Sequence, residues 1–313
     1  MIEVTVANRK VQAERIVSFE LVGLSELPAF EAGAHIDVEV APGLVRQYSI
    51  ASNPAERHRY LLGVLHEQNS RGGSKRIHSH FLPGTCVRIA PPRNHFRLHE
   101  DAAYSILIAG GIGVTPLLSM AHRLQRLHRS FVLHYCARSR GAAAFLNEIA
   151  TSDFAHRVEL HFDDGPPEQA FDPDAIFASA GNGAHVYVCG PSGFITYVTS
   201  KAAEFDVPST QMHVEYFSAD VDVTGASFSV TAARSGIEVL VGPEQTIAEV
   251  LSAHNIAVLL SCQEGVCGTC LTAVIEGVPD HRDLYLTDAE KAAGNQMTIC
   301  CSRAKTNRLV LDI

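Results

Sequence analysis

The segment SCQEGVCGTC, residues 261–270, places three cysteines within ten residues. Four residues separate Cys262 from Cys267, and two separate Cys267 from Cys270. Three thiols held this closely suggest a metal centre, which needs a fourth ligand. The next cysteine along the chain is Cys300, with 29 residues between it and Cys270, so the full spacing is C-x4-C-x2-C-x29-C.

This spacing favours an iron–sulfur cluster over zinc. Plant-type [2Fe–2S] sites use C-x4-C-x2-C followed by a distant cysteine, whereas zinc sites usually pair their ligands in two short C-x2–4-C hairpins. Cys300 has no partner at hairpin spacing, because the next cysteine, Cys301, is adjacent. Gly265 and Gly268 allow a tight loop whose N–H groups turn toward the sulfurs. Zinc and fortuitous free thiols are the alternatives.

Length and composition narrow the class of protein. A chain of 313 residues predicts two or three domains. Its apolar runs are shorter than the ~18–20 residues that span a bilayer, and its start, MIEVTVANRK, lacks the features of a signal peptide. We therefore expect a cytoplasmic protein without a membrane partner, in which clustered cysteines serve as metal ligands or redox groups.

The charge is unevenly distributed along the chain. The net charge is −9, but residues 1–100 carry 12 basic against 10 acidic side chains, and residues 227–313 carry 6 against 10. Because no region is strongly basic, nucleic acid is not expected as a partner. The first third retains room for a small anionic ligand.

Hydrophobic periodicity divides the chain into three regions. Residues 1–100 hold short β-rich runs broken by Gly, Pro and Asn, which predict an antiparallel barrel or sandwich. From residue 101 strands and helices alternate, as in a parallel α/β sheet. Residues 218–226 are small, polar and acidic and are interpreted as a linker. Residues 227–313 hold strands, a helix, the cysteine loop and a closing strand.

The segment RQYS in the first region suits a flavin. Arg46 is suited to pairing with a phosphate, Tyr48 to lying against the isoalloxazine ring, and Ser49 to a hydrogen bond near the reactive N5. Four residues are weak evidence by themselves, and Tyr48 packing inside the barrel is the alternative.

The segment RGGSKR, residues 71–76, adds a phosphate site to this interpretation. It is expected to open a short helix, whose first N–H groups bind phosphate, and a terminal phosphate dianion favours FMN over FAD. A solvated basic turn is the alternative. The expected flavin-phosphate residues are Arg46, Arg71, Gly72, Gly73, Ser74, Lys75 and Arg76.

The segment AGGIGVTPLLSM, residues 109–120, follows a buried strand and opens a helix, as a dinucleotide loop does. Its glycines permit close approach to a pyrophosphate, and Pro116 is placed like a first helical residue. A plain tight turn is the alternative. The expected nucleotide-binding residues are Gly110, Gly111, Gly113, Thr115 and Pro116.

A second loop, YVCGPSGF (187–194), also ends a buried strand, where open α/β sheets bind ligands. Cys189, Gly190 and Pro191 are its candidate residues. Taken alone, Cys189 is as well explained as an inert buried thiol.

The cysteine loop and the closing segment ICCSRAKTNRLVLDI resemble the phthalate dioxygenase reductase family, which includes the reductases of vanillate demethylase type. RQYS, GGS and CGP resemble flavin and nicotinamide elements of the wider ferredoxin reductase superfamily. The resemblance implies three domains: an FMN-binding antiparallel β-barrel (1–100), an NAD-binding α/β domain (101–220) and a β-grasp [2Fe–2S] ferredoxin domain (227–313).

The resemblance also implies roles for particular residues. Cys189 would lie near the nicotinamide and the flavin, Phe217 against the second face of the flavin, and Glu215 would be the acidic residue two positions before it. Core packing at a domain junction is the alternative for Phe217. The family places its last ligand before a variable residue and S-R-A, which selects Cys300. Interpreted as a strand, MTICCSRA would also turn Cys301 to the opposite face.

The family implies an electron-transfer function. NADH would reduce FMN, and a [2Fe–2S] cluster held by Cys262, Cys267, Cys270 and Cys300 would pass single electrons to a Rieske-type oxygenase in a transient encounter. The protein itself is expected as a monomer. Two alternatives are a regulatory protein that senses NADH or redox state, and a zinc-stabilised protein with a vestigial flavin fold.

Overall fold

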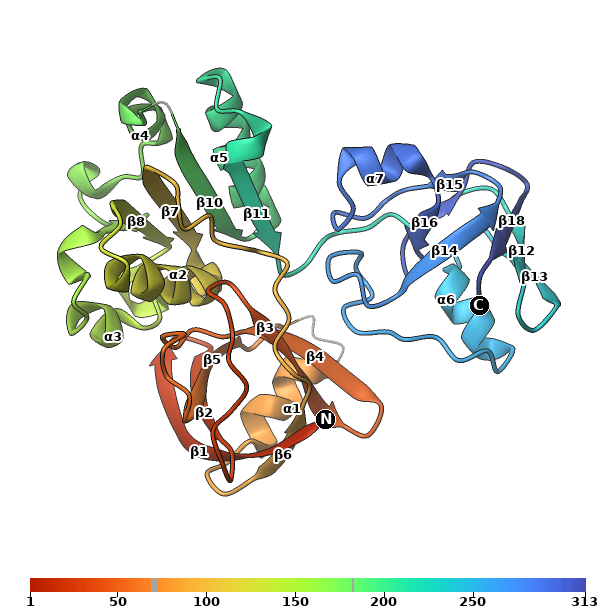
Figure 1. The fold of residues 1–313 in the computed structure, drawn as a ribbon, viewed down its shortest axis with the longest axis horizontal. Helices are drawn as coiled ribbons and strands as arrows, with labels where there is room; N and C mark the ends of the chain where they lie inside the picture. Colours follow the sequence, from red (N-terminus) through yellow and green to blue (C-terminus); the bar gives the residue numbers. More distant parts are fainter. Residues whose placement is uncertain (69–71, 182) are drawn as a thin grey trace. The chain divides into compact units, whose positions relative to one another are not determined.

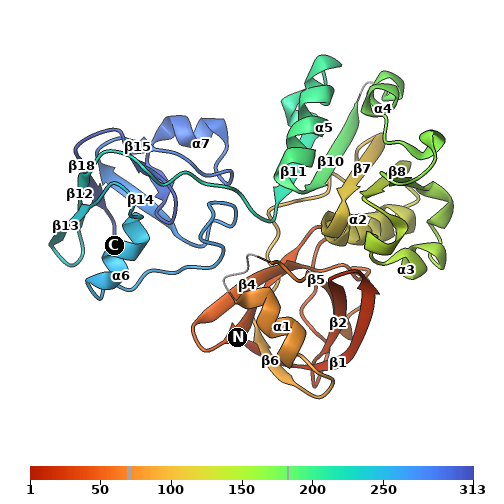
Figure 2. The ribbon, with the colours of Figure 1, turned by 180° about the vertical axis from the view of Figure 1, so that it is seen from behind.

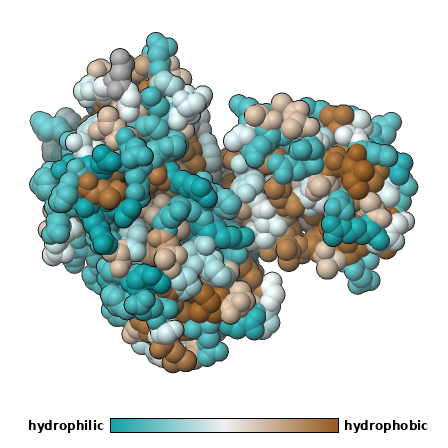
Figure 3. All heavy atoms as spheres, in the orientation of Figure 1, coloured by the Kyte–Doolittle hydropathy of each residue, from teal (hydrophilic) through white to brown (hydrophobic). Residues whose placement is uncertain are grey.

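The computed structural model describes residues 1–68, 72–181 and 183–313. This part of the chain forms two compact units, Met1–Phe217 and Ser218–Ile313 (Figure 1; seen from behind in Figure 2). No described helix has the length and apolar character to cross a membrane. On the face drawn in Figure 3, hydrophobic side chains lie in small groups among hydrophilic ones.

The first unit begins with an antiparallel sheet that closes into a barrel, drawn in red and orange in Figure 1. The strand order is β4-β3-β6-β1-β2-β5, and a bridge between Ile50 and Leu62 joins its two ends. Helix α1 (Gly73–His80) buries Ile77 in the barrel core. The strands are β1 (Ile2–Ala13), β2 (Ile16–Val22), β3 (His35–Ala41), β4 (Leu44–Ser49), β5 (Arg59–Leu65) and β6 (Cys86–Ile89).

The rest of this unit is a parallel sheet in the order β11-β10-β7-β8-β9. Leu107 and Ala109 pack on the side of helix α2, whereas Ile106 and Ile108 pack on the side of α5. The strands are therefore buried on both faces, as their continuous apolar runs predict. The strands are β7 (Tyr104–Gly110), β8 (Phe131–Ala137), β9 (Val158–Phe162), β10 (Ala184–Gly190) and β11 (Met212–Tyr216).

The helices of this region connect those strands along the chain. The α-helices are α2 (Val114–Arg126), α3 (Leu146–Ala150), α4 (Pro173–Ser179) and α5 (Ser192–Glu204). Short 3₁₀ turns are η1 (Gly111–Gly113), η2 (Arg140–Ala142), η3 (Ala155–Arg157), η4 (Pro167–Gln169) and η5 (Ser209–Gln211). Helix α2 begins at Val114, so Pro116 is its third residue rather than its first. Proline is tolerated there because N–H groups of the first turn have no partner within the helix.

The second unit is a mixed sheet in the order β13-β12-β18-β14-β16, with β12 and β18 parallel. Helix α6 packs Ile247 and Leu251 into its core, as a β-grasp requires, and a capping box of Thr246 and Glu249 begins the helix. The elements are β12 (Phe228–Ala232), β13 (Ile237–Val241), α6 (Ile247–Ala253), β14 (Leu271–Glu276), β15 (Pro279–Asp280), α7 (Asp288–Ala293), β16 (Gln296–Thr298), β17 (Arg303–Ala304) and β18 (Arg308–Leu311).

The segment interpreted as a linker has neither helix nor strand, but the second unit binds its end. The guanidinium of Arg303 donates to the carbonyl oxygens of Val223 (2.7 Å) and Ala226 (3.0 Å). The guanidinium of Arg282 donates to the carbonyl oxygens of Asp222 and Thr224. Residues 222–226 therefore belong structurally to the second unit.

The prediction of a strand through MTICCSRA is wrong. Strand β16 ends at Thr298, and Cys300 and Cys301 lie in a turn before β17. The N–H of Ser302 closes this turn by donating to the carbonyl oxygen of Thr298 at 3.1 Å. The chain turns here because β16 pairs with β14, whereas β17 pairs with β15 in a separate sheet.

Candidate functional site

The four cysteines predicted as cluster ligands come together in the second unit. The thiol of Cys262 is hydrogen-bonded to those of Cys267 and Cys300, and Cys270 to Cys300. Cys267, Cys270 and Cys300 are buried, and Cys262 is partly buried. The neighbouring thiols, with N–H groups of the loop, lower the pKa of Cys262. Four converging sulfurs, one of them stabilised as a thiolate, fit the donor set of a [2Fe–2S] cluster.

Two glycines allow the loop to fold around these sulfurs. Gly265 and Gly268 have φ values of +69° and +68°, which side chains rarely adopt. A Cβ at residue 265 would lie 2.6 Å from the sulfur of Cys301, and one at residue 268 would lie 2.2 Å from the ring of Tyr285. The close approach of Tyr285 comes from a segment with no motif, so the sequence offered no signal for it.

Cys301 occupies a different environment from Cys300. Its sulfur lies 3.1 Å from the hydroxyl oxygen of Thr298 and also contacts Cys300. The nearby hydroxyl of Ser302 donates to the buried carboxylate of Asp283 at 3.3 Å. Sequence analysis missed Asp283, which also accepts from the N–H of Leu286 at 2.7 Å and so holds the loop that carries Tyr285.

In the first unit, strand β4 and helix α1 bring the predicted flavin residues together. A Cβ at Gly73 would lie 2.8 Å from Nε of Arg46, so the arginine side chain lies directly against the start of α1. Gly72 precedes the helix at φ +91°. The hydroxyl oxygen of Ser74 accepts from the N–H of Glu67 at 3.1 Å, and Lys75 is exposed. A guanidinium beside a helix N-terminus fits a phosphate.

Other flavin candidates differ in their exposure. Tyr48 is partly buried against the barrel core, and burial raises the pKa of its hydroxyl. Phe217 follows β11 and is 38% exposed, so its ring is open to a ligand. Arg71 lies outside the described residues.

The two glycine loops of the parallel sheet also meet, because β7 and β10 are neighbours. A Cβ at Gly113 would lie 2.2 Å from the carbonyl oxygen of Cys189, and one at Gly190 would lie 3.0 Å from Cα of Gly110. Neither position has room for a side chain. Phe194, which sequence analysis did not single out, packs on both Gly110 and Gly190.

The remaining residues of these loops serve the backbone. The hydroxyl of Thr115 donates to the carbonyl oxygen of Ile112 at 3.0 Å. Gly111 has φ +54°, and Pro191 is the N-cap of α5. The loop backbones therefore lie at the carboxyl ends of two adjacent parallel strands, the usual ligand-binding edge of such a sheet.

Ser49, Cys189 and Glu215 form a junction between the barrel and this edge. Cys189 and Glu215 are paired neighbours on β10 and β11, and the hydroxyl of Ser49, at the end of β4, donates to Oε2 of Glu215 at 3.4 Å. Burial raises the pKa of Cys189 well above its ordinary value and that of Glu215 to about 8. Burial thus disfavours the charged forms of both groups at the point where the predicted flavin and nicotinamide residues meet.

Replacement of Glu215 by Gln is expected to stabilise the protein increasingly as the pH rises from about 5 to 8. The folded-state pKa of about 8 lies above the ordinary 4.5. The stability that proton binding contributes is therefore complete below the ordinary pKa and is lost as the pH rises through the folded value. Glutamine stays neutral, so the stability of the Gln variant does not fall through this change of charge. Thermal unfolding midpoints of both proteins across this range measure the difference.

The exposed carboxylate of Glu168 provides the control for this experiment. Glu168→Gln should shift the midpoint by the same small amount at each pH. A Glu215→Gln difference that is constant across the range would contradict the raised pKa.

Two family models match this chain. The 2Fe-2S iron-sulfur cluster binding domain matches residues 230–305, and the oxidoreductase NAD-binding domain matches residues 107–200. The first match confirms the prediction of an iron–sulfur cluster over zinc, and the second confirms the nucleotide-binding interpretation of the parallel sheet.

Two relatives match this chain over nearly its whole length. The chain is 46% identical over 319 residues to the vanillate O-demethylase oxidoreductase of Pseudomonas sp. (strain HR199 / DSM 7063), with 100% of both covered. It is 39% identical over 313 residues to the phthalate dioxygenase reductase of Burkholderia cepacia, covering 98% of this chain and 96% of the relative.

A solved structure agrees with these relatives. It is the structure of phthalate dioxygenase reductase, described as modular for electron transfer from pyridine nucleotides to [2Fe–2S]. It matches with a TM-score of 0.76 at 38% identity, covering 100% of this chain and 98% of that one. With these matches over its whole length, the chain belongs to the phthalate dioxygenase reductase family of NADH-dependent oxidoreductases, which carry FMN and a [2Fe–2S] cluster and reduce oxygenases.

Proposed function

We propose that this protein takes hydride from NADH and delivers single electrons to a Rieske-type oxygenase. The proposal is carried by the presence of one redox site in each unit. Ser49, Cys189 and Glu215 meet at the nucleotide edge of the first unit, and four thiols gather in the second. When bound, FMN and the cluster would supply the chemistry that turns a hydride into single-electron transfers.

The flavin phosphate is assigned to the start of α1. Arg46 supplies a guanidinium beside Gly73, and the N–H groups of Gly73 and Ser74 begin the helix without partners inside it. Gly72 allows the backbone to enter the helix at positive φ. Lys75 adds an exposed positive charge. This assignment leaves Tyr48 and Ser49 to hold the flavin ring.

The nicotinamide end is assigned to the two glycine loops and the junction beside them. Gly110, Gly111 and Gly113 let the backbone approach the nucleotide, with Thr115 and Pro116 in the first turn of α2.

Cys189, followed by Gly190 and Pro191, ends the neighbouring strand. Glu215 lies beside Cys189 at this edge, within hydrogen-bond reach of Ser49. The exposed ring of Phe217 is assigned to cover the flavin.

The outlet is assigned to the cluster ligands Cys262, Cys267, Cys270 and Cys300. The domain bounds proposed with this mechanism are 1–100 for the flavin, 101–220 for the nucleotide and 227–313 for the cluster. None of the eight cysteines forms a disulfide, which supports a cytoplasmic location.

The proposed partner is a Rieske-type oxygenase that meets a monomer of this protein transiently. The relatives named for a demethylase and a dioxygenase support an oxygenase partner. Redox encounters of this kind bury under about 1,200 Å². The acidic excess of residues 227–313 predicts a basic docking face on that partner.

The test measures whether NADH reduces a purified Rieske oxygenase only when this protein is present, followed by the absorbance and EPR of the oxygenase centre. The rate should fall as salt is added, because screening weakens attraction between charged faces. Ferricyanide reduction in the same salt series controls for the NADH and flavin steps. Reduction of ferricyanide without reduction of the Rieske centres of several such oxygenases would reject the proposed partner class.

A further inference from the structure

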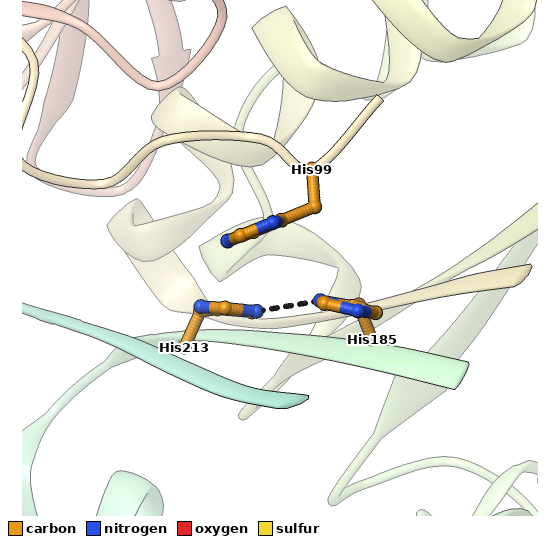
Figure 4. A group of neighbouring side chains, drawn as sticks. All are labelled: His99, His185 and His213. Carbon is orange, nitrogen blue, oxygen red and sulfur yellow. Dashed lines mark hydrogen bonds between the residues drawn. The ribbon is translucent and has the colours of Figure 1, made fainter. Parts of the chain in front are cut away.

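Three histidines from separate segments gather in the first unit, and none of them is among the residues assigned to FMN, NADH or the cluster. His99 lies in the connector between β6 and β7, His185 in β10 and His213 in β11. One ring nitrogen of each lies within 4.8 Å of the other two (Figure 4). His99 is exposed and the other two are partly buried, so the group is open to solvent.

The three rings lie close together, with the plane of His99 at 34° and 27° to those of His185 and His213. Nδ1 of His185 and Nε2 of His213 lie 2.8 Å apart, with ring planes 8° from parallel. The ring of His99 lies across this pair in Figure 4, with its centroid 4.7 Å from each of theirs. Zinc–nitrogen bonds of about 2.0–2.1 Å in tetrahedral geometry place two ligand nitrogens about 3.3 Å apart. Because imidazole lone pairs lie in the ring plane, a small outward movement of the paired rings together with rotation of all three rings would turn the nitrogens toward one ion.

Tyr187 holds the ring of His213 and the backbone of His99 in place. The backbone N–H of His99 donates to the hydroxyl oxygen of Tyr187 at 2.8 Å. The ring of Tyr187 also stacks on His213, with centroids 4.6 Å apart and planes 20° from parallel. Because Tyr187 is fully buried, one rigid side chain positions both the connector and β11. Such an arrangement lowers the entropy that is lost when the ligands are ordered by an ion.

His185 and His213 also favour the neutral form that a metal requires, because burial lowers the pKa of both. In the 2.8 Å contact between His185 and His213, one nitrogen must offer a lone pair to the other. Burial and the neighbouring imidazoles lower the pKa of His213 to about 4. The group therefore contains neutral imidazole at pH 7, and neutral imidazoles are good ligands for Zn²⁺, Cu²⁺ and Ni²⁺.

We propose that His99, His185 and His213 bind a divalent late transition-metal ion, with Zn²⁺ as the physiological ion and water as the fourth ligand. The ion would crosslink the connector to strands β10 and β11. His185 precedes Cys189 by four residues on β10, or about 13 Å at the usual strand rise. The ion would therefore lie toward the amino end of β10, away from the glycine loops, with His213 two residues before Glu215 on β11.

The first experiment uses the oxidised holoprotein after removal of loosely bound metal with EDTA. In this state the cluster gives no EPR signal, and its cysteines are already occupied by iron. One equivalent of Cu²⁺ is then added. A type 2 signal with splitting from three nitrogens is expected. A spectrum with only one or two nitrogens would overturn the proposal.

The second experiment measures Zn²⁺ affinity by competition with a chromophoric chelator. Loss of a ligand in His99→Asn should weaken binding at least about tenfold. The matched control is His161→Asn. His161 belongs to the other histidine group of the described residues, where its Nε2 lies 3.1 Å from Nδ1 of His134. This control should bind Zn²⁺ as the wild type does. Unchanged affinity in His99→Asn, or weakened affinity only in His161→Asn, would overturn the proposal.

Folding of the variants is checked independently. His99 is exposed in a connector, so His99→Asn should keep its flavin and, without metal, the unfolding midpoint of the wild type. If it does not, His185→Asn in the same competition decides the question, with unchanged affinity rejecting the site. Added Zn²⁺ should raise the unfolding midpoint of the wild type and of His161→Asn but not of the His99 variant.

Discussion

The reduced protein is expected to lose its [2Fe–2S] EPR signal when Cys300 is replaced by Ser and to keep it when Cys301 is replaced. The sulfur of Cys300 contacts those of Cys262 and Cys270, so its loss removes a thiolate from the converging set. The sulfur of Cys301 lies beside the hydroxyl of Thr298. Serine at residue 301 would retain a hydrogen-bonding group in that pocket.

The two single variants are each other's control, because they change the same atom in adjacent residues. Iron and acid-labile sulfide per chain should fall almost to zero, or the EPR signal should change form, in Cys300→Ser only. Flavin content and the rate of flavin reduction by NADH should be unchanged in both. A normal cluster in Cys300→Ser together with its loss in Cys301→Ser would reverse the ligand assignment.

A chain ending at Phe217 is expected to remain a flavoprotein that NADH reduces but to lose delivery of electrons to the oxygenase completely. The unit Met1–Phe217 has its own hydrophobic cores, in the barrel and on both faces of the parallel sheet. It also holds the residues proposed to bind the flavin and the nucleotide. The thiols, by contrast, lie in a core formed by residues of the second unit.

Two arginines of the second unit explain why the truncated chain should end at Phe217 and not at residue 226. Arg282 and Arg303 donate to carbonyl oxygens of residues 222–226. A chain ending at residue 226 would therefore keep residues 222–226 without the arginines that bind them. Stopped-flow absorbance measures flavin reduction in the truncated protein, and oxygenase turnover measures delivery. Full-length Cys300→Ser controls for the cluster alone. Oxygenase turnover by the truncated protein would show that electrons leave from the flavin.

The sequence by itself determined the kinds of element and their order. Alternating and continuous apolar runs predict a β-rich first third followed by a parallel sheet, and both are present, because side-chain periodicity directly reflects strand and helix geometry. Cysteine spacing identified the cluster, since a loop of this length leaves the ligands few other arrangements. The glycines at 113 and 268 were also readable, as the backbone comes too close there for a side chain.

Tertiary structure alone decided which distant residues meet. Ser49 reaches Glu215, Tyr285 covers Gly268, and three histidines separated by up to 114 positions share one edge of a sheet. Local pattern also misjudged the segment around Cys300, where a strand was predicted and a turn is present. The reason is physical: periodicity records how a segment is buried, whereas the pairing of strands across the chain determines where it must turn and what it contacts.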